Sequence, residues 1–324
     1  MKQAIYKTHG KADAVVELVE LARPVLEAGQ TRVKILCAPI NPSDIAQAEG
    51  VYGFQPPLPA AAGMEGIGEV IEVNGEGPEV GTLVLLAEPP GSWSTEKVMN
   101  TAAVVPVPPA DIDQLSMLSV NPATAYLLLT KYVALNEGDW LIQSAGNSAV
   151  AGLVASLAKA RGVKVAALVR RDSAVADAQD AGADAVFVDG PDLAERVDAE
   201  LEVAPRLALD AVGGSSLGRL ASTLQAGGTA VMYGNMSGED AQLPDSAVIF
   251  NDVIVRGFWL VHWFNTATAE EQAQVYGELT AMILQGTLKA SVDRIFPLEE
   301  INAALAYTMK GGRSGKVLIA PNGL

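Results

Sequence analysis

Between residues 116 and 260, short apolar runs alternate with Ala-rich segments of helical character, and this alternation constrains the fold more than any other feature. The apolar runs are DWLIQSA, VKVAALV, DAVFVD, LALDAV and GTAVMYG, and VAGLVASLAKARG lies between the first two. Strands that alternate with helices form a parallel sheet covered by helices on both faces. The sequence therefore predicts an α/β domain with a doubly wound parallel sheet.

The flanking segments have a different character. TRVKILCAPI, GIGEVIEV and GTLVLLAE predict short strands separated by turn residues. Further on, AEEQAQVYGELTAMILQG predicts an amphipathic helix that ends at Gly286, and GKVLIAP predicts a final strand. We expect a mostly β domain made of residues 1–118 and 264–324, with the α/β domain at residues 119–263.

Composition excludes several classes of protein. Hydrophobic residues make up 49% of the chain, which is enough for a large core, and the net charge of -16 argues against nucleic-acid binding. Cys37 is the single cysteine, so no disulfide can form within the chain. No uncharged apolar run approaches the ~20 residues that span a bilayer. We expect a soluble, cytoplasmic protein without a membrane partner.

The turn after DWLIQ is built from small residues. Gly146, Asn147, Ser148, Ala149 and Val150 stand where a parallel strand passes into a helix. The N–H groups and partial positive charge of a helix N-terminus attract a pyrophosphate, and small residues let the backbone approach it. Alanines stand where glycine is usual, so as a motif the match is weak. The turn predicts a dinucleotide site, with an ordinary strand-to-helix turn as the alternative.

The end of the second strand indicates which dinucleotide. A site for NAD carries Asp or Glu there to hold the ribose hydroxyls. This chain has Arg170 and Arg171, followed by Asp172. A 2′-phosphate requires cations that can form two hydrogen bonds, so NADPH is favoured. The alternative is a pair of solvated arginines.

Three segments resemble the medium-chain dehydrogenase/reductase superfamily: NPSDIAQAEGVYGFQPPLPAAAGMEGIGEV, SVNPATAYLLL and VRGFWLVHW. Within that superfamily they are most similar to the trans-2-enoyl-thioester reductases of the mitochondrial type, and next to the zinc-free quinone oxidoreductases. The resemblance covers essentially the whole chain. It implies a GroES-like, mostly β domain, a Rossmann domain and a homodimer.

The metal ligands of the zinc members are missing. Asp44, Met64 and Asn121 stand at the comparable places. Catalytic zinc needs three protein ligands of N, O or S type, and the chain has one cysteine and only two histidines, His9 and His262. We expect no metal, and hydride transfer to an activated C=C bond.

The resemblance assigns the proton donor to the tyrosine of G-x-Y, which is Tyr52 here. The alternative for Tyr52 is an aromatic ring packed in a loop beside prolines. Asn41, Trp259 and Trp263 would shape the substrate pocket. The implied cofactor residues are Asn121, Thr124, Gly146, Asn147, Ser148, Ala149, Val150, Arg170, Arg171, Asp172, Tyr233, Gly234, Asn235, Met236, Phe258, Trp259, Leu260 and Lys316.

Three functions follow from these observations. The first is NADPH-dependent reduction of a trans-2-enoyl thioester, with hydride delivered to the β-carbon and a proton to the α-carbon. The second is reduction of a quinone, enone or acrylate by the same fold, where Tyr52 is the discriminating residue. The third is a non-catalytic NADPH-binding protein. The acidic composition favours acyl-CoA or small free substrates over an acidic carrier protein.

Overall fold

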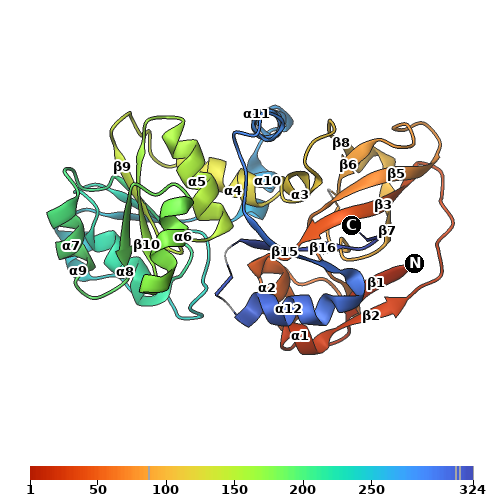
Figure 1. Ribbon diagram of the computed structural model, residues 1–324, viewed down its shortest axis with the longest axis horizontal. Helices are drawn as coiled ribbons and strands as arrows, with labels where there is room; N and C mark the ends of the chain where they lie inside the picture. Colours follow the sequence, from red (N-terminus) through yellow and green to blue (C-terminus); the bar gives the residue numbers. More distant parts are fainter. Residues whose placement is uncertain (87, 311, 314, 324) are drawn as a thin grey trace. The chain divides into compact units, whose positions relative to one another are not determined.

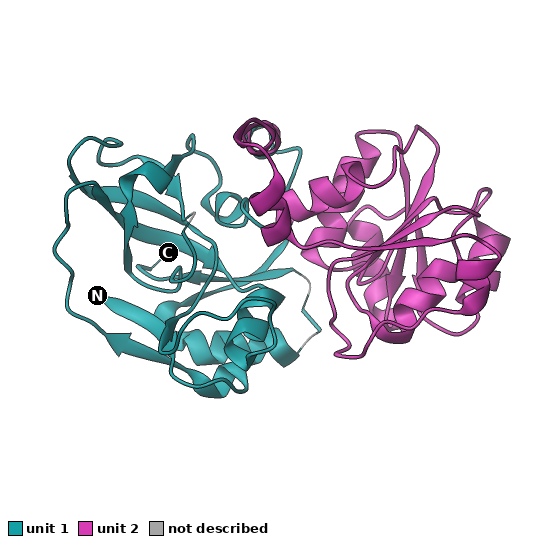
Figure 2. Cartoon of the chain, turned by 180° about the vertical axis from the view of Figure 1, so that it is seen from behind, with its two compact units in different colours: residues 1–120, 279–324 teal, residues 121–278 magenta. Residues whose placement is uncertain are grey.

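The computed structural model describes all residues of the chain except 87, 311, 314 and 324. The chain forms two compact units: unit 1 comprises residues 1–120 and 279–324, and unit 2 comprises residues 121–278 (Figure 2). The sequence-based division places these boundaries at residues 118 and 263. Residues up to 278 belong to unit 2 because Tyr126 donates a 2.7 Å hydrogen bond to Glu278 and the Trp263 and Tyr276 rings lie 6.4 Å apart.

The strands of unit 2 form one parallel sheet. Within the described residues its order is β11-β10-β9-β12-β13-β14. Figure 1 labels two of its strands, β9 and β10. The first strand of the unit, β9, lies at the centre, so the chain winds outward in both directions from it. The strands are β9 (Trp140–Gln143), β10 (Lys164–Val169), β11 (Ala185–Val188), β12 (Leu207–Asp210), β13 (Thr229–Met232) and β14 (Ile254–Gly257).

Helices cover both faces of this sheet. Ile142 and Leu168 belong to a core that includes residues of α7 and α8, while Ala167 and Val169 pack with Ala178 of α6. The helices are α4 (Asn121–Thr130), α5 (Ala149–Lys159), α6 (Val175–Asp180), α7 (Leu193–Glu200), α8 (Gly214–Ser222), α9 (Asp245–Ile249), α10 (Leu260–Thr266) and α11 (Ala269–Leu284), with a 3-10 turn at Asp172–Ala174. The predicted doubly wound parallel sheet is confirmed.

Unit 1 is mostly β. One of its sheets has the order β2-β1-β4, and the other has the order β15-β16-β3-β5-β6-β8, with β7 also paired to β3. The strands are β1 (Lys2–Tyr6), β2 (Val16–Glu20), β3 (Gln30–Pro39), β4 (Ala60–Ala61), β5 (Ile67–Asn74), β6 (Leu83–Leu85), β7 (Glu96–Asn100), β8 (Val105–Pro106), β15 (Val292–Pro297) and β16 (Lys316–Ala320).

Both ends of the chain contribute to unit 1. Strand β16 pairs antiparallel with β3, with Leu318 opposite Pro39 and Ile319 opposite Ala38. This pairing brings the start of β16 beside the end of β3. The helices are α1 (Ala12–Val15), α2 (Pro42–Glu49), α3 (Ile112–Ser116) and α12 (Ile301–Lys310), and 3-10 turns lie at Thr101–Ala103 and Leu298–Glu300. No described helix is both long and apolar enough to cross a bilayer.

Candidate functional site

The predicted cofactor residues of unit 2 gather along one edge of its sheet. Residues 146–150 follow β9, residues 170–172 follow β10, residues 233–236 follow β13 and residues 258–260 follow β14. The carboxyl ends of parallel strands lie on the same side of a sheet, which is where ligands bind in this class of fold. The topology therefore brings four separately predicted segments together.

The turn after β9 explains why alanine is accepted in it. Ala145 is the residue with positive φ, at 50°, whereas Ala149 is the first residue of α5. A Cβ at Gly146 would lie 2.6 Å from the Cβ of Ala167, so only glycine fits there. Ser148 caps α5 by accepting a 3.2 Å hydrogen bond from the N–H of Ala151. The first turn of α5 is regular helix, which alanine favours.

The two arginines after β10 differ. Arg171 is half-buried, and its Nε donates to the hydroxyl of Ser173 at 2.9 Å. Arg170 is exposed and forms no hydrogen bond or ion pair within the described part of the chain. Asp172 is exposed and begins a 3-10 turn. Of these two arginines, Arg170 is thus the more available to an external anion.

A carboxylate that the sequence analysis missed lies after the neighbouring strand. Asp210, at the end of β12, is fully buried and accepts hydrogen bonds from the hydroxyl of Ser144 at 2.7 Å and from the N–H of Gly213 at 2.7 Å. Burial raises its pKa, against the effect of these hydrogen bonds. The run LALDAVGG, an acid followed by two glycines after an apolar strand, was the available signal. Asp210 therefore holds the loop that follows β12 to Ser144, the residue after β9.

The predicted cofactor residues 233–236 directly follow β13. Tyr233 N–H donates to Asp210 O at 2.8 Å, and burial raises the pKa of its phenol. Gly234 leaves no room for a side chain, since a Cβ would lie 2.8 Å from Ala211 O, and the following residues, Asn235 and Met236, are exposed.

Aromatic residues surround the segment after β14. Phe258 N–H donates to Met232 O at 2.9 Å, and Trp259, which is 40% exposed, precedes Leu260 at the start of α10. Trp263 is buried against Phe264 and Tyr276, with ring centroids at 5.3 and 6.4 Å. Asn121 and Thr124 are both nearly buried in the first turn of α4.

Tyr52 lies in unit 1, just beyond the end of α2. Gly50 ends this helix in the left-handed region, with φ of 81°. The N–H groups of Val51 and Tyr52 both donate to Ala46 O, at 2.9 and 3.2 Å. The carbonyl of Tyr52 accepts a 3.1 Å bond from Gln55 Nε2, and the side chain is half-buried. The backbone of Tyr52 is therefore fixed to α2.

A cluster of charged and polar side chains lies buried in unit 1 at the other end of α2. Asn41, Asp44, Glu65 and Lys316 are 2%, 4%, 1% and 5% exposed. Asn41 Nδ2 donates to Glu65 Oε1 at 2.6 Å, and the N–H of Val120 donates to Glu65 Oε2 at 2.9 Å. Lys316 Nζ donates to Ile40 O at 2.9 Å and also to Asn41 Oδ1. We refer to these four residues as the buried cluster.

Burial dominates the protonation of the buried cluster. It raises the pKa of Glu65 to about 8 and that of Asp44 to about 6, and it lowers the pKa of Lys316 to about 8. The hydrogen bond from Asn41 and the charge of Lys316 act in the opposite direction on Glu65. Asn41 was predicted in the substrate pocket and Lys316 beside the cofactor; both side chains are committed to partners inside unit 1.

The residues at the places of the zinc ligands do not fit that metal. Asp44 offers a carboxylate, Met64 a thioether and Asn121 an amide. Catalytic zinc is held by His, Cys or acidic side chains, three to a site. Among the described residues, no group of three or more His, Cys, Asp or Glu side chains could hold a metal ion.

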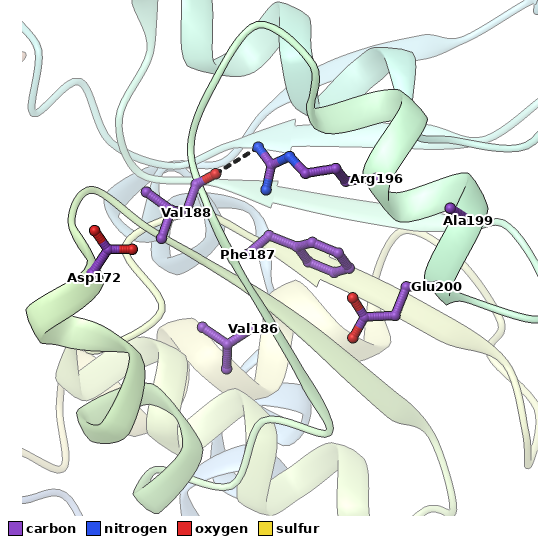
Figure 3. Close-up of a pocket in the computed structure, with 7 residues that line it drawn as sticks. All are labelled: Asp172, Val186, Phe187, Val188, Arg196, Ala199 and Glu200. Carbon is purple, nitrogen blue, oxygen red and sulfur yellow. Dashed lines mark hydrogen bonds between the residues drawn. The ribbon is translucent and has the colours of Figure 1, made fainter.

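A separate hollow of about 670 Å³ lies along the outer strand β11 of unit 2 (Figure 3). Of the predicted site residues only Asp172 reaches it. Arg196 points across the hollow and donates to Val188 O at 2.8 Å and to Asp192 at 3.0 Å. Because the other residues that line the hollow lie outside the segments predicted to bind the cofactor, the hollow is distinct from the edge that gathers those segments.

Comparisons with known proteins agree with this arrangement. Residues 27–109 match the family described as alcohol dehydrogenase GroES-like domain, and residues 149–278 match zinc-binding dehydrogenase. The mitochondrial enoyl-[acyl-carrier-protein] reductase of Rattus norvegicus is 36% identical over 322 residues, which cover 96% of this chain and 86% of the rat protein. The chain belongs to the enoyl-[acyl-carrier-protein] reductase family. This family lies within the medium-chain dehydrogenase/reductase superfamily, and the predicted fold class is confirmed.

Solved structures extend the likeness over the whole chain. The complex of Etr1p, a 2-enoyl thioester reductase of Candida tropicalis, with NADP and crotonyl-CoA has a TM-score of 0.87 and 28% identity, and covers 98% of this chain and 99% of its own. A putative NADPH:quinone reductase of Bacillus thuringiensis has a TM-score of 0.89 and 25% identity, and covers 98% of both chains. The names of these two neighbours correspond to the two catalytic functions predicted from the sequence.

Proposed function

We propose that this protein reduces the C=C bond of a trans-2-enoyl thioester with NADPH. The observation that carries the proposal is Tyr52, which α2 holds by backbone hydrogen bonds at the place where the family resemblance assigns the proton donor. Reduction of an enoyl thioester needs a hydride at the β-carbon and a proton at the α-carbon. A phenol is chemically suited to the second step.

Unit 2 supplies the cofactor-binding residues. The turn at Ala145 and Gly146 presents the N-terminus of α5, which suits a pyrophosphate. Arg170 directly follows β10, the next strand in the sequence, and its side chain is exposed. Its guanidinium suits a 2′-phosphate. When bound, NADPH supplies the hydride. The predicted segments after β13 and β14 would line the rest of the cofactor, with backbone groups of residues 258–260 toward its carboxamide.

The role proposed for Tyr52 is to hold and deliver one proton. Negative charge gathers on the thioester oxygen as the β-carbon gains hydride, and the charge spreads onto the α-carbon. The phenolic O–H of Tyr52 donates to this system and completes the saturated thioester. Help from such an acid is typically worth ~10²–10⁴-fold in rate.

The test is Tyr52→Phe, which keeps the ring and removes the O–H. With crotonyl-CoA, kcat should fall by at least about a hundredfold. NADPH binding, followed by fluorescence, should change little, because the predicted cofactor residues other than Lys316 all belong to unit 2. Unchanged turnover of crotonyl-CoA would remove Tyr52 from the mechanism.

Quinone reduction is the second candidate, favoured by the similarity to the Bacillus thuringiensis structure. Quinone oxygens can take protons from solvent, so this reaction should depend less on Tyr52. A screen of NADPH oxidation across crotonyl-CoA, quinones, enones and acrylates separates the two enzymes. Wild-type activity on quinone alone would establish the second function, and activity on any of these acceptors would exclude a non-catalytic NADPH-binding protein.

We also propose that the reaction needs no metal, because Met64 and Asn121 are not zinc ligands. Purified active protein should contain far less than one zinc per chain, and chelators should leave its rate unchanged. Stoichiometric zinc together with chelator-sensitive activity would contradict this proposal.

A homodimer is supported by the exposed edge of unit 2. Strand β14 pairs with β13 on one side and with no other described strand, and its Ile254 and Val255 are 46% and 37% exposed. An unpaired apolar edge favours pairing with a second copy. Sedimentation should show a dimer that Ile254→Lys weakens and Val203→Lys, at another exposed position, does not. A monomeric wild type would exclude the homodimer.

We propose a cytoplasmic location, since a chain with one cysteine can form no internal disulfide, and such bonds are rare in the cytosol. Cell fractionation tests this. Recovery with mitochondria, the compartment named for the relatives, would overturn it.

A further inference from the structure

One residue of the turn after β9 has an unfavourable backbone conformation. Ala145 has φ of 50°, in the left-handed region, and it is one of two described residues other than glycine with a positive φ. A Cβ crowds the backbone in this region, so the conformation persists only where the surrounding structure imposes it. Because strained backbone is concentrated at functional sites, the groups that hold Ala145 bear on how the turn binds its ligand.

Backbone hydrogen bonds hold the turn on both sides of Ala145. The N–H of Ser144 donates to Leu209 O of β12 at 2.9 Å, and the N–H of Gly146 donates to Leu168 O of β10 at 2.8 Å. Strands β10 and β12 are the two neighbours of β9 in the sheet. The residues before and after Ala145 are therefore attached to different strands.

Two buried side chains strengthen the attachment to β12. The hydroxyl of Ser144 donates to Asp210 Oδ1 at 2.7 Å and accepts from the N–H of Ala211 at 2.8 Å. The Asp210 carboxylate also accepts from the N–H groups of Val212 and Gly213, at 3.1 and 2.7 Å. A buried carboxylate is costly unless it is hydrogen-bonded, and these bonds join the turn after β9 to the loop after β12. We refer to Ser144 and Asp210 as the serine–aspartate pair.

We propose that Ser144 and Asp210 are positioning residues for the cofactor: they hold Ala145 in its left-handed conformation and so fix the start of α5 for the pyrophosphate of NADPH. Neither residue belongs to the predicted cofactor-binding set, and neither needs to touch the cofactor. A site that adopts its binding conformation for only a fraction of the time binds more weakly by that fraction. The proposal rests on the proposed function, because it requires that NADPH binds at this turn.

Ser144→Ala tests the proposal, because it removes both side-chain bonds to the loop after β12 and leaves Asp210 bonded within that loop. The Kd of NADPH, followed by fluorescence, should rise about three- to tenfold, and that of NADH by the same factor, because both carry a pyrophosphate. The Ki of 2′-AMP, which has the 2′-phosphate but no pyrophosphate, should stay within about twofold. With crotonyl-CoA and saturating NADPH, kcat should also stay within about twofold, as expected when only uniform binding is lost.

Ser222→Ala is the matched control, since the Ser222 hydroxyl donates to Gly218 O at 3.0 Å within α8 of the same unit. It should bind NADPH, NADH and 2′-AMP as wild type does. An equal loss of affinity for all three ligands in Ser144→Ala would indicate general damage and overturn the proposal, as would an unchanged Kd of NADPH. Should Ser144→Ala fail to fold, Ser144→Cys replaces it, because a thiol is only a weak donor, and the same pattern is expected.

A double-variant cycle with Asp210→Ala shows whether the serine–aspartate pair acts as one unit. In the Asp210→Ala background, Ser144→Ala should weaken NADPH binding by less than about a further twofold. Fully additive losses would overturn the proposal. A wild type that binds neither NADPH nor NADH would instead contradict the proposed function, and that result is obtained before any variant is made.

Discussion

Two cations, Lys316 of unit 1 and Arg170 of unit 2, lie in opposite surroundings. Unit 1 buries Lys316 and commits its ammonium to Ile40 and Asn41, whereas unit 2 leaves Arg170 exposed and without a partner in the described part of the chain. A buried, bonded cation orders the chain around it, while an exposed one can take an anion from solution. The family resemblance implies a cofactor-binding role for both residues, and that role stays a prediction for each.

Two buried carboxylates, one from each unit, also differ. Asp210 accepts hydrogen bonds from the Ser144 hydroxyl, 66 residues away, and from the N–H groups of Val212 and Gly213 just after it. Glu65 accepts from the amide of Asn41, 24 residues away, and from the N–H of Val120, 55 residues away. Asp210 therefore holds the loop after β12 to the residue after β9, whereas Glu65 connects the segments that precede α2, β5 and α4. The following predictions test this contrast, beginning with the largest expected effect.

Asp210→Ala should lower the free energy of unfolding of unit 2 by about 3 kcal/mol, because several buried donors would lose a charged acceptor at ~1–3 kcal/mol each. Urea titration followed by amide exchange in β9, β12 and β13 measures this. Asp198→Ala, at an exposed position of α7, is the control and should stay within about 0.5 kcal/mol. Equal stability of the two variants would show that Asp210 does not hold its loop.

Arg170→Ala should raise the KM for NADPH about tenfold and leave the KM for NADH nearly unchanged. A hydrogen bond to a charged group is worth ~1.5–3 kcal/mol, and 1.4 kcal/mol corresponds to about tenfold in affinity. Steady-state kinetics with both cofactors measure the effect. A wild type that uses NADH as well as NADPH would contradict the role of this arginine.

Glu65→Gln should change how stability depends on pH. The pKa of Glu65 is raised to about 8 in the folded state from an ordinary value of 4.5, so its contribution to stability is fully present below pH 4.5 and is lost as the pH rises toward 8. The glutamine variant lacks this loss. Between pH 5 and 7.5 its stability relative to wild type should rise by about 1 kcal/mol or more, as one pKa unit corresponds to 1.36 kcal/mol. A constant difference in urea midpoints across this range would argue against a raised pKa.

The smallest effect is expected when the thiol of Cys37 in the folded protein is exposed to a disulfide reagent. Its thiol is 3% exposed, and burial raises its pKa to about 12, so almost no thiolate forms at pH 8. A disulfide reagent should leave the folded protein unlabelled at pH 8 and label one thiol per chain in urea. Rapid labelling of the folded protein would show that this strand of unit 1 opens readily.

The fold could be predicted because its signals are local. The parallel sheet follows from apolar runs separated by helical segments, and the carboxyl ends of its strands gather residues such as Gly146 and Arg170 without further information. The roles of the alanines in the turn were harder to predict. The positive φ of Ala145 and the place of Ala149 as the first residue of the helix both depend on where the turn begins.

The buried cluster could not be predicted for a different reason. Glu65 follows a methionine in a segment that is typical of an ordinary turn, and Lys316 is typical of the polar first residue of a strand. Only the pairing of β16 with β3 brings Lys316 to Asn41, and nothing in either segment alone specifies that pairing. The ligand-binding roles of Asn41 and Lys316 follow from the resemblance and stay predictions, while their hydrogen bonds to each other could not be read from the sequence.

The discontinuous make-up of unit 1 also bears on how the protein is synthesised. Translation proceeds at ~5–20 residues per second, so Lys316 leaves the ribosome tens of seconds after Asn41. Throughout that interval the nascent unit 1 carries Asp44 and Glu65 without the ammonium of Lys316, and unit 2 is completed before Lys316 is added. The acidic pair must then remain hydrated or protonated, and unit 1 can close only after translation has passed β16. If ribosomes stall on this messenger RNA after unit 2 but before β16, chains with a folded unit 2 and an open unit 1 should accumulate.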